Sequence, residues 1–328
     1  MMATRRTGFA AGAPECRPSA TRVTVLMGGT SAEREVSLLS GREVSKALRS
    51  AGFLVKDVDL QPDEVRLLAG RDFDVAFIAL HGGFGEDGTL QRQLDRLGLA
   101  YTGSGAEASR LAMDKVASKE LFVAAGVATP DWRLVARGDA AGTREAYDAL
   151  GSAVAVKPRD DGSSVAVTLA ETFEAFQAGL DAVFKIRGEA LVERLVRGRE
   201  LTVGVLADQG LPIIEIIPDA AFYDYNAKYL SDATRYVANP ELPAGLTERI
   251  QALAVAAHRS LGCRDFSRVD VMLDSAGEPT VLEVNTIPGF TTHSLLPKAA
   301  AAAGLDFAAL CRTMVELALS RKVAGQGR

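Results

Sequence analysis

The amino-acid sequence predicts a mixed α/β and α+β chain of several domains, with a parallel sheet near its N-terminus. From residue 21 to about residue 110, short β-branched runs alternate with helical stretches, which is typical of βαβ units and a parallel sheet. Later in the chain, pairs of β-branched runs are separated by turn-forming residues, which predicts antiparallel hairpins. A chain of 328 residues is long enough for two or three units with hydrophobic cores of their own.

The N-terminal unit contains three predicted strands, RVTVLM, FLVKDVDL and DVAFIAL. A first helix is expected to begin near Ser31, and GTLQRQLDRLG is expected to form a second. The glycine-rich loops GGTSAERE and HGGFGEDG follow the first and third strands. Because ligands on parallel sheets collect at the carboxyl ends of the strands, we expect a binding site at these two loops.

The rest of the chain divides into two further units. The first contains a helix over MDKVASKELFVAAG, strands over AVAVKP and SVAVTLA, and the segment LVERLV. The second contains ELTVGVL, PIIEIIP, a tyrosine-rich loop, a hairpin and AAAAAG, which is expected to be helical because alanine is the best helix former. The first twenty residues are predicted to be a flexible tail rather than a targeting peptide. The expected domains are therefore 1–20, 21–110, 111–196 and 197–328.

Composition excludes several classes of protein. The chain is 48% hydrophobic and 24% charged, as in an ordinary soluble protein, and its net charge of -5 gives no reason to expect a nucleic-acid partner. No apolar run approaches the roughly 18–20 residues that span a bilayer, so no membrane partner is expected. The 3 cysteines are far apart and lack metal-binding spacing, which favours a reducing cytoplasm.

Two carboxylates stand in an apolar hairpin near the C-terminal end. The runs RVDVML and TVLEVN flank the turn DSAGEP, which places Asp270 opposite Glu283 and Arg268 opposite Asn285. Side chains alternate between faces with period two, so all four project from one face. Like charges directly opposed are destabilising, and carboxylate and amide oxygens are ligands that Mg²⁺ accepts, so a bound cation is one interpretation. The alternative is a solvated sheet face on which Arg268 neutralises one acid.

The segment VKPRDDGSSV combines a lysine at a strand end with a loop of small polar residues. Backbone amides freed by Gly162, together with the hydroxyls of Ser163 and Ser164, suit phosphate oxygens, and Lys157 supplies a positive charge. The alternative is an ordinary hairpin with a polar turn.

Two other loops are candidates for binding. NTIPGFTTHS follows the hairpin, and its backbone amides with Thr291, Thr292 and Ser294 would place oxyanion donors beside the acids. The alternative is a turn that leads into a helix capped by Thr or Ser. FYDYNAKYLSD holds three tyrosines and Lys228 without a regular period, which predicts a lid or a surface loop with aromatic anchors.

Several known signatures are missing from the sequence. No Gly-Lys pair occurs, so the chain has no P-loop, and GGTSAE does not match the dinucleotide signature GxGxxG. The GxSxG motif of serine hydrolases is also missing. His81 lies at a strand end, and His258 lies in a predicted helix and is interpreted as structural. Neither has a His or Cys at metal-binding spacing.

Although no single motif decides the function, their joint order closely resembles the D-alanine–D-alanine ligases, which are ATP-grasp enzymes. The resemblance extends from about residue 21 to about residue 319. It is carried by GGTSAEREVSLLSG, ALHGGFGEDGTLQ, YTGSG, MDK, VKP with GSSV, FYDYNAKYLSD, RVDVML and EVNTIPGFTTHSL.

The resemblance implies a fold, a reaction and an assembly. The fold is a Rossmann-like domain of the kind that precedes an ATP-grasp fold, followed by the two-part ATP-grasp fold itself. The reaction uses ATP to phosphorylate the carboxylate of one D-alanine. The amine of a second D-alanine then attacks the acyl phosphate, and phosphate leaves a tetrahedral intermediate. The dipeptide serves peptidoglycan precursor synthesis, and the enzyme is expected to be a cytoplasmic homodimer.

The resemblance also assigns nucleotide and metal residues. Lys115 and Lys157 match lysines that hold phosphates, Glu200 matches a ribose-binding acid, and the metal is expected to be a pair of Mg²⁺ ions, with Mn²⁺ as a substitute. The adenine hinge corresponds to Glu193, Leu195 and Val196, and the metal ligands correspond to Asp270, Glu283 and Asn285.

Substrate residues are assigned in the same way. Glu33 matches the acid that binds the first D-alanine's ammonium group and links to Ser163 and Tyr229 in a set that closes the lid. Arg268 and the Gly289 amide match groups that stabilise the tetrahedral oxyanion. The remaining residues near the substrates correspond to His81, Lys228, Ser294 and Leu295.

Two positions depart from the family pattern, and three other functions compete with this one. Arg159 and Ala166 stand where many relatives have small residues; Arg159 either contacts phosphate or alters loop mobility. The rival functions are a D-alanine–D-lactate ligase, a non-catalytic binding module and another ATP-grasp ligase. The segment FYDYNAKYLSD argues against the D-alanine–D-lactate ligase, and the intact acids argue against the binding module. The joint presence of GGTSAERE and KYLSD argues against another ATP-grasp ligase.

Overall fold

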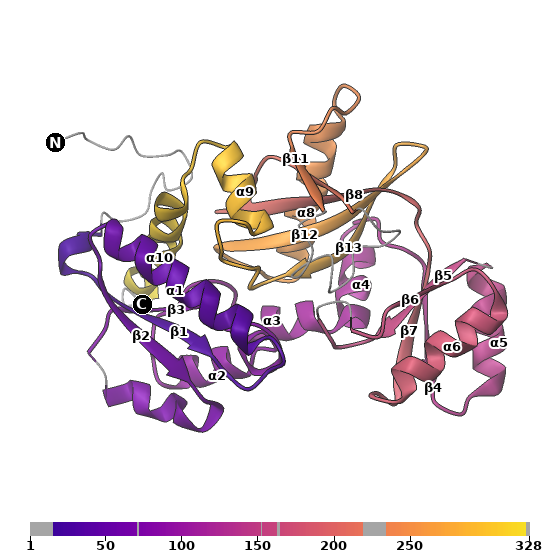
Figure 1. Ribbon diagram of the computed structural model, residues 1–328, viewed down its shortest axis with the longest axis horizontal. Coiled ribbons are helices and arrows are strands. Elements are labelled where there is room, and N and C mark those ends of the chain that lie inside the picture. Colours follow the sequence, from indigo (N-terminus) through magenta and orange to yellow (C-terminus); the bar gives the residue numbers. More distant parts are fainter. Residues whose placement is uncertain (1–15, 71, 152, 163–164, 219–233, 326–328) are drawn as a thin grey trace.

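The computed structural model describes residues 16–325, except 71, 152, 163–164 and 219–233. Within these residues, the strands form three sheets that follow one another along the long axis of the molecule (Figure 1). The N-terminal sheet lies at one end, the central sheet lies at the other, and the C-terminal sheet lies between them. The predicted mixed α/β fold is confirmed.

The N-terminal sheet is parallel, as the βαβ rhythm predicted, and its strand order is β2-β1-β3. The first helix begins at Arg34 rather than near Ser31, because Gly28 and Gly29 have positive φ angles and the following residues form a turn. A side chain at position 28 would collide with the Asp59 carboxylate, so glycine is required there. The elements of this unit are the short 3-10 helix Pro18–Ala20, β1 (Arg22–Gly28), α1 (Arg34–Ser50), β2 (Leu54–Leu60), the 3-10 helix Pro62–Gly70, β3 (Val75–Ile78), the 3-10 turn Gly83–Gly85 and α2 (Thr89–Arg96).

The central sheet is antiparallel with strand order β4-β7-β5-β6, and α5 and α6 pack on it. The strand predicted over SVAVTLA is shorter than expected, because only Thr168–Ala170 pairs with β5. The preceding residues form a turn in which the Val165 amide donates to the Gly162 carbonyl and Ala166 has a positive φ of 53°. The elements are β4 (Trp132–Ala136), α5 (Ala140–Leu150), β5 (Val154–Pro158), β6 (Thr168–Ala170), α6 (Phe173–Phe184) and β7 (Glu189–Arg194).

The C-terminal sheet has the order β11-β10-β8-β12-β13, with β9 paired to β8, and its pairings are antiparallel. On β12, Val269 and Val271 face a buried core shared with α8, so residues at even positions project from the opposite face. The elements are β8 (Gly198–Leu206), β9 (Gln209–Gly210), β10 (Ile214–Ile217), β11 (Arg235–Ala238), α8 (Leu246–Ser260), β12 (Phe266–Asp274), β13 (Pro279–Asn285), α9 (Leu295–Ala302) and α10 (Phe307–Gly325). The helix predicted over AAAAAG is confirmed for the first four alanines, because α9 ends at Ala302.

The stretch MDKVASKELFVAAG does not form one continuous helix. α3 (Ala106–Met113) ends before Asp114, and α4 (Lys115–Ala124) begins after it. The Asp114 carboxylate caps α4 by accepting the amides of Val116 and Ala117, at 3.1 and 3.2 Å. Lys115 therefore stands at the first position of α4.

Hydrophobic packing joins segments that are far apart in the sequence. Leu310, Met314 and Val315 of α10 belong to the same buried cluster as Val25 and Phe77 of the N-terminal sheet. Similarly, residues of α3 and α4 share a core with the C-terminal sheet. The expected domain limits stay a prediction. Among the described residues, no helix is long and apolar enough to cross a membrane.

A buried ion pair fastens α10 to the rest of the molecule. Arg321 pairs with the buried carboxylate of Asp265 and donates to the Tyr101 carbonyl at 2.7 Å. Asp265 also accepts the Gly103 amide at 2.9 Å, and Arg264 donates to the Gly103 carbonyl at 3.0 Å. These contacts connect the C-terminal helix with the segment at residues 101–103 and with the residues that directly precede β12.

The substitution Asp265→Asn is expected to lower the free energy of unfolding by about 3 kcal/mol, because Arg321 would lose its buried counter-charge. Asparagine tolerates the positive φ of 62° at this position, so backbone strain should not contribute. Denaturant unfolding would measure the change. Asp208→Asn is the control, because Asp208 has the same φ of 62° but an exposed carboxylate. Equal free energies of unfolding for the two variants would contradict a stabilising role of the pair between Arg321 and Asp265.

Candidate nucleotide and metal site

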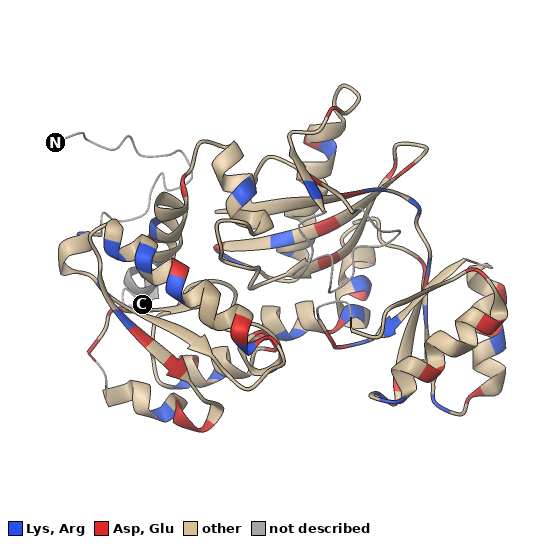
Figure 2. Ribbon diagram, viewed as in Figure 1, with Lys and Arg blue, Asp and Glu red and all other residues tan. Residues whose placement is uncertain are grey.

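The hairpin predicted from the sequence is confirmed as β12 and β13. Asp270 pairs with Glu283 and Arg268 pairs with Asn285, so the four polar side chains share the face opposite the Val269 core. The register shifts by one residue directly after Asp270, and this bulge enters neither of the two polar pairs. Charged positions of both signs stand on these adjacent strands (Figure 2).

Asp270 is held by three side chains. Arg268 donates to both carboxylate oxygens, from Nε at 2.9 Å and from Nη2 at 2.8 Å. The Thr202 hydroxyl donates at 2.7 Å, and Asn285 Nδ2 donates at 3.0 Å. The structure therefore shows the alternative in which Arg268 neutralises one acid. The face is not solvated, however, because the Asp270 side chain is only 13% exposed.

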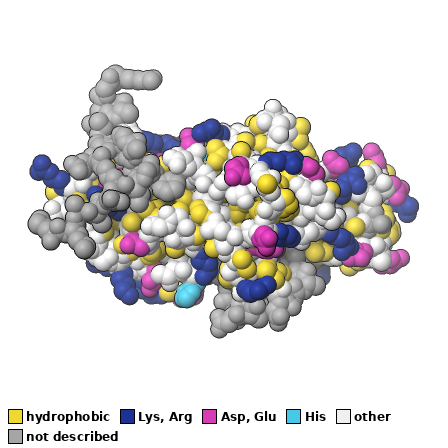
Figure 3. All heavy atoms as spheres, turned by 90° about the horizontal axis from the view of Figure 1, so that it is seen from above, with side chains coloured by type: hydrophobic (Ala, Val, Ile, Leu, Met, Phe, Trp, Pro, Cys, Tyr) yellow, Lys and Arg dark blue, Asp and Glu magenta, His cyan; other side chains and the backbone are white. Residues whose placement is uncertain are grey.

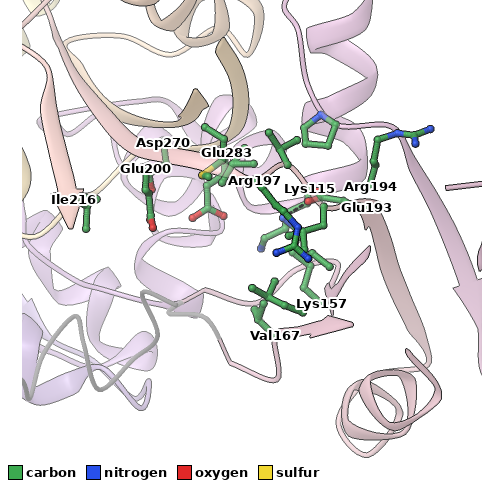
Figure 4. A pocket seen from close by; sticks show the side chains of 18 of the residues that line it. Lys115, Lys157, Val167, Glu193, Arg194, Arg197, Glu200, Ile216, Asp270 and Glu283 are labelled. Carbon is green, nitrogen blue, oxygen red and sulfur yellow. Dashed lines mark ion pairs between the residues drawn. The ribbon is translucent and has the colours of Figure 1, made fainter. Parts of the chain in front are cut away.

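A cavity of about 520 Å³ opens beside this hairpin, between the central and C-terminal sheets. Figure 4 shows Glu200, Asp270 and Glu283 on one side of it and Lys115, Lys157 and Val167 on the other. The rest of its lining combines charged residues, which include Arg194, Arg197, Arg199 and Glu215, with apolar residues, which include Leu169, Leu195, Val196, Ile216, Met272 and Leu282. An apolar slot bordered by charged groups of both signs suits a planar ring attached to phosphates.

Lysine side chains from α4 and β5 surround the carboxylate of Glu193 on β7. Lys157 Nζ lies 2.7 Å from Oε2, and Lys119 Nζ lies 2.9 Å from Oε1. Lys115 Nζ donates to the Asp161 carbonyl at 2.5 Å. Positive charge is thus concentrated at one wall of the cavity, opposite the acids of the hairpin.

Burial and charge shift the pKa values of this cluster. Burial lowers the pKa of the Lys119 ammonium to about 8, although Glu193 opposes the shift. Burial also lowers the pKa of Lys115. At Glu193, burial alone would raise the pKa of the carboxyl, but the ammonium groups of Lys157 and Lys119 outweigh it, so the pKa lies below its usual value.

The loop after β5 is fastened to α4 by Arg159. Its guanidinium donates to both oxygens of Asp114, from Nε at 2.8 Å and from Nη2 at 2.7 Å. The Arg159 carbonyl accepts the Lys115 amide at 3.0 Å. Among the two sequence-based interpretations of Arg159, the structure supports an effect on the loop, because the guanidinium is engaged with the helix cap.

Removing this fork should affect both stability and nucleotide affinity. The substitution Arg159→Ala is expected to lower the free energy of unfolding by about 1 kcal/mol, since the guanidinium is 37% exposed and partly screened. The KM for ATP should also rise a few-fold, because α4 carries Lys115, which the resemblance assigns to the nucleotide phosphates. Arg144→Ala, which breaks an exposed pair with Asp148, is the control for both measurements. An unchanged KM for ATP in the Arg159 variant would show that the bonds between Arg159 and Asp114 do not affect nucleotide binding.

A second cavity of about 480 Å³ lies on the other side of the same loop. Asp161, Gly162 and Val165 line both cavities, so this loop forms the wall between them. Glu33 lines the second cavity at the end of the loop that follows β1. The further lining residues include Ser31, Gly82, Gly83, Arg110, Asp114 and Arg187. The carboxyl ends of β1 and β3 therefore meet a cavity, as the parallel sheet predicted.

His81 braces the loop after β13 rather than lining either cavity. Its Nε2 lies 2.9 Å from the Ser40 hydroxyl, and its Nδ1 lies 3.2 Å from the Ile287 carbonyl. Glu86 Oε1 lies 3.4 Å from Nδ1. The Phe290 amide donates to the same Ser40 hydroxyl at 3.4 Å. This network fixes the backbone on both sides of residue 289.

The loop NTIPGFTTHS leads into α9, as the alternative interpretation expected, but the Ser294 hydroxyl makes no capping hydrogen bond to the helix. Ser294 occupies the N-cap position, and its hydroxyl accepts the Thr291 amide at 3.1 Å. Leu295 is buried in the core that α9 shares with the N-terminal sheet. A Cβ atom at Gly289 would lie 2.7 Å from the Ser294 hydroxyl oxygen, so the loop packs tightly at this glycine.

The structure thus brings many of the predicted residues together. The first cavity is lined by Lys115, Lys157, Glu193, Leu195, Val196, Glu200, Asp270 and Glu283, and the second by Glu33. Arg268 and Asn285 join the first group through Asp270, whereas the lining of neither cavity includes His81, Gly289, Ser294 or Leu295. The predictions for Ser163, Ser164, Lys228 and Tyr229 lie outside the described residues.

Sequence reasoning missed two residues that hold the site. Lys119 is completely buried against Glu193, and Thr202 donates to Asp270. The spacing of Lys115 and Lys119 was an available signal, since residues four apart share one face of a helix. His258, in contrast, is structural as predicted: it is buried in α8 against Ser267, and burial lowers its pKa to about 4.

The donor set of the hairpin fits a hard divalent cation that also binds phosphate. Two carboxylates and one amide oxygen come from adjacent positions on one face. Among the described residues, no cluster of three His, Cys, Asp or Glu side chains is placed to hold a metal alone. Mg²⁺ commonly takes one or two carboxylates and completes its shell with water and substrate phosphates, which is the arrangement this donor set allows.

Comparisons with known proteins identify the family of this chain. The sequence matches the family models described as D-ala D-ala ligase N-terminus, over residues 63–104, and D-ala D-ala ligase C-terminus, over residues 121–316. A D-alanine–D-alanine ligase of Geobacter sulfurreducens is 44% identical over 308 residues, which cover 94% of this chain and 96% of that protein.

Solved structures show the same similarity. A crystal structure of D-alanine–D-alanine ligase from Bacillus anthracis superposes with a TM-score of 0.84 and 37% identity, covering 93% of this chain and 100% of that chain. A structure of the Bacillus anthracis ligase complexed with ATP gives a TM-score of 0.82 and 36% identity over 93% of this chain and 99% of that chain. The chain described here belongs to the D-alanine–D-alanine ligase family, whose fold is the ATP-grasp fold.

Proposed function

We propose that the cavity between the central and C-terminal sheets is the ATP site of this ligase, and that the second cavity receives D-alanine. The protein is an ATP-dependent ligase that joins two D-alanines through a D-alanyl phosphate for peptidoglycan precursor synthesis. One observation supports this assignment of the ATP site: the first cavity has Lys115 and Lys157 on one wall and Asp270 and Glu283 on the other. Lysines that can bind phosphate oxygens and acids that can bind a divalent cation are what a nucleoside triphosphate with its metal ion requires.

In the proposed nucleotide pose, adenine lies in the apolar slot and its phosphates point toward the hairpin. Glu193, Leu195 and Val196 edge the slot, and Glu200 stands where a ribose would follow. Lys115 and Lys157 would then hold phosphate oxygens. Their buried positions support this role, because a water-poor site strengthens each contact between an ammonium group and a phosphate.

Asp270, Glu283 and Asn285 would hold Mg²⁺, with Mn²⁺ as a substitute, and a second ion would bind with the phosphates. The cation supplies charge that offsets the negative charge of the transferring phosphoryl group. Arg268 would leave Asp270 when the cation binds, since both compete for the same carboxylate. The released guanidinium is then available to the reacting centre.

The residues of the chain support the two chemical steps as follows. In the first step, the carboxylate of one D-alanine attacks the γ-phosphorus of ATP, and ADP leaves. In the second step, the neutral amine of the other D-alanine attacks the acyl carbon, and phosphate leaves the tetrahedral intermediate. Arg268 and the Gly289 amide would stabilise the oxyanion of that intermediate, and a closed site would exclude the water that hydrolyses acyl phosphates.

D-alanine recognition is proposed to begin at Glu33. Its position in the second cavity would place a carboxylate against the ammonium group of the first D-alanine. Ser163 and Tyr229 would join Glu33 when the lid closes, and Lys228 and Ser294 would bind the carboxylate of the second D-alanine. His81 would act by fixing the loop that carries Gly289, as its contacts with Ser40 and Ile287 support, while Leu295 packs under the same loop.

A homodimer in the cytoplasm is the proposed state of the protein. Leu39, Leu54 and Leu67 of the N-terminal unit are between 49% and 56% exposed, and such apolar side chains would suit a contact between subunits. On the face seen in Figure 3, lysine, arginine and acidic side chains are interspersed, so this face does not show the continuous basic patch that binds nucleic acid. Light scattering tests this state: a dimer has twice the chain mass of 34.6 kDa. The mass of a single chain at assay concentrations would contradict it.

Turnover with identified products tests the proposed specificity. The protein is incubated with ATP, Mg²⁺ and D-alanine, with L-alanine, or with D-alanine plus D-lactate, and ADP and the products are measured. We expect ADP to form with D-alanine and D-alanyl-D-alanine to be the product. An ester product would instead indicate a D-alanine–D-lactate ligase. Tight binding of ATP without condensation would indicate a binding module.

A further inference from the structure

We infer that Lys119 is a positioning residue for nucleotide binding, which keeps Glu193 neutralised while Lys157 turns from Glu193 to the phosphates of ATP. This inference rests on the proposed function, in that it takes the first cavity as the nucleotide site. Lys119 itself does not line that cavity, whereas Glu193 and Lys157 do.

The geometry sets the Glu193 carboxylate between two ammonium groups. Lys119 Nζ lies 2.9 Å from one oxygen, and Lys157 Nζ lies 2.7 Å from the other. The Glu193 side chain is 3% exposed and the Lys119 side chain is completely buried, whereas the Lys157 side chain is 11% exposed and faces the cavity. The two lysines are therefore not equivalent, because only Lys157 is placed to change partners when a ligand enters.

The segment at residues 129–132 also holds Lys119 in this position. Its ammonium donates to the Thr129 hydroxyl at 2.7 Å and lies 3.5 Å from the Pro130 carbonyl. The ring of Trp132 stands 5.6 Å from the same nitrogen, within the range of a cation–π interaction. Trp132 and Glu193 are paired residues on neighbouring strands, so Lys119 is anchored to the sheet that carries its partner.

The arrangement has a consequence for nucleotide affinity. A buried carboxylate without a counter-charge is strongly unfavourable. If Lys119 were missing, Lys157 would become the counter-charge that Glu193 retains in this cluster, and a phosphate would have to compete with Glu193 for it. With Lys119 in place, Glu193 keeps one ammonium partner throughout, and Lys157 is released at lower cost. Lys119 also connects α4, which carries Lys115, to the sheet that carries Lys157.

The test compares Lys119→Met with Lys119→Arg in the full-length enzyme. We expect Lys119→Met to raise the KM for ATP about tenfold, with the KM for D-alanine unchanged, because one partner of a buried charge pair is lost on the nucleotide side. Lys119→Arg retains the charge and should restore most of the affinity. Lys185→Met, which removes an exposed lysine beside α6, is the matched control and should behave as the wild type.

A double-mutant cycle shows whether Lys119 acts through Glu193. In a Glu193→Gln background no carboxylate charge needs neutralising, so adding Lys119→Met should have little further effect on the KM for ATP. Fully additive effects of the two substitutions would overturn the inference. If Lys119→Met does not fold, Thr129→Val serves as a milder variant, because it removes the hydroxyl that holds Lys119. An unchanged KM for ATP in the Thr129 variant would then count against the role inferred for Lys119.

The same data separate this inference from the proposed function. If Lys119→Met leaves the KM for ATP unchanged while Lys157→Met raises it, Lys119 is structural and the nucleotide site stands. If neither substitution alters ATP affinity, the cavity is not the nucleotide site.

Discussion

Replacing Glu283 with glutamine is expected to lower kcat by about 10²–10³-fold and to leave the fold intact. The substitution keeps the size of the side chain but removes a carboxylate that faces Lys115, Lys157 and the proposed metal position. Loss of one group that stabilises developing charge in a preorganised site has an effect of this order. The measurement is Mg²⁺-dependent ADP release, with circular dichroism to confirm the fold.

The same hairpin supplies the control for this prediction. Glu278 stands near the turn, and its carboxylate is 59% exposed and paired with Arg249. Glu278→Gln should therefore leave turnover unchanged. If Glu283→Gln retained full Mg²⁺-dependent turnover, the assignment of Glu283 to the metal would be wrong.

The substitution Arg268→Met is expected to lower kcat by about 10²–10³-fold with a much smaller change in the KM for ATP. Methionine retains much of the length of the side chain but cannot donate hydrogen bonds to an oxyanion. Because the oxyanion exists only after phosphoryl transfer has activated the first D-alanine, the loss should fall on kcat rather than on nucleotide binding. Steady-state kinetics with ATP and D-alanine varied separately would measure both parameters.

Arg268 also neutralises Asp270 in the structure, which gives a competing explanation. If that were its sole role, Arg268→Met would tighten binding of the cation, since Asp270 would lose a competitor, and kcat would stay near the wild-type value. Arg249→Met is the control, because Arg249 forms its pair with Glu278 at the exposed end of the hairpin. A kcat for Arg268→Met equal to that of this control would contradict the oxyanion role.

Local pattern was sufficient to predict the centre of the site. The alternation of RVDVML and TVLEVN sets the pairing of Asp270 with Glu283, because a shift of one residue would turn the valines out of the core. The parallel order of the N-terminal sheet was predictable for a similar reason, since strands that alternate with helices have few alternatives. In both cases, neighbouring residues in the sequence carry the information.

Contacts between distant segments were not predictable in this way. The pairing of Lys119 with Glu193 joins a helix to a strand more than seventy positions later, and no periodicity relates them. The fork between Arg159 and Asp114 is of the same kind. Likewise, the packing of α10 on the N-terminal sheet follows from which apolar faces meet in space. Such contacts depend on the assembled fold rather than on local propensity.

Local conformation also overrode propensity at one point. The β-branched residues of SVAVTLA favour a strand, yet pairing begins only at Thr168. The turn closed by Gly162 and Val165 and the positive φ of Ala166 bend the chain before that residue. The same bend makes the loop a wall between the two cavities, so the deviation from the predicted strand has a structural consequence at the site.

The most direct test of the proposed site is a crystal structure of the protein with ADP and Mg²⁺. We predict a metal ion at about 2.0–2.1 Å from oxygens of Asp270, Glu283 and Asn285, the distance typical of Mg²⁺. The adenine ring should occupy the apolar slot, and Arg268 should have left Asp270. Nucleotide bound outside this cavity, or an intact pair of Arg268 and Asp270 with the metal bound elsewhere, would contradict the account.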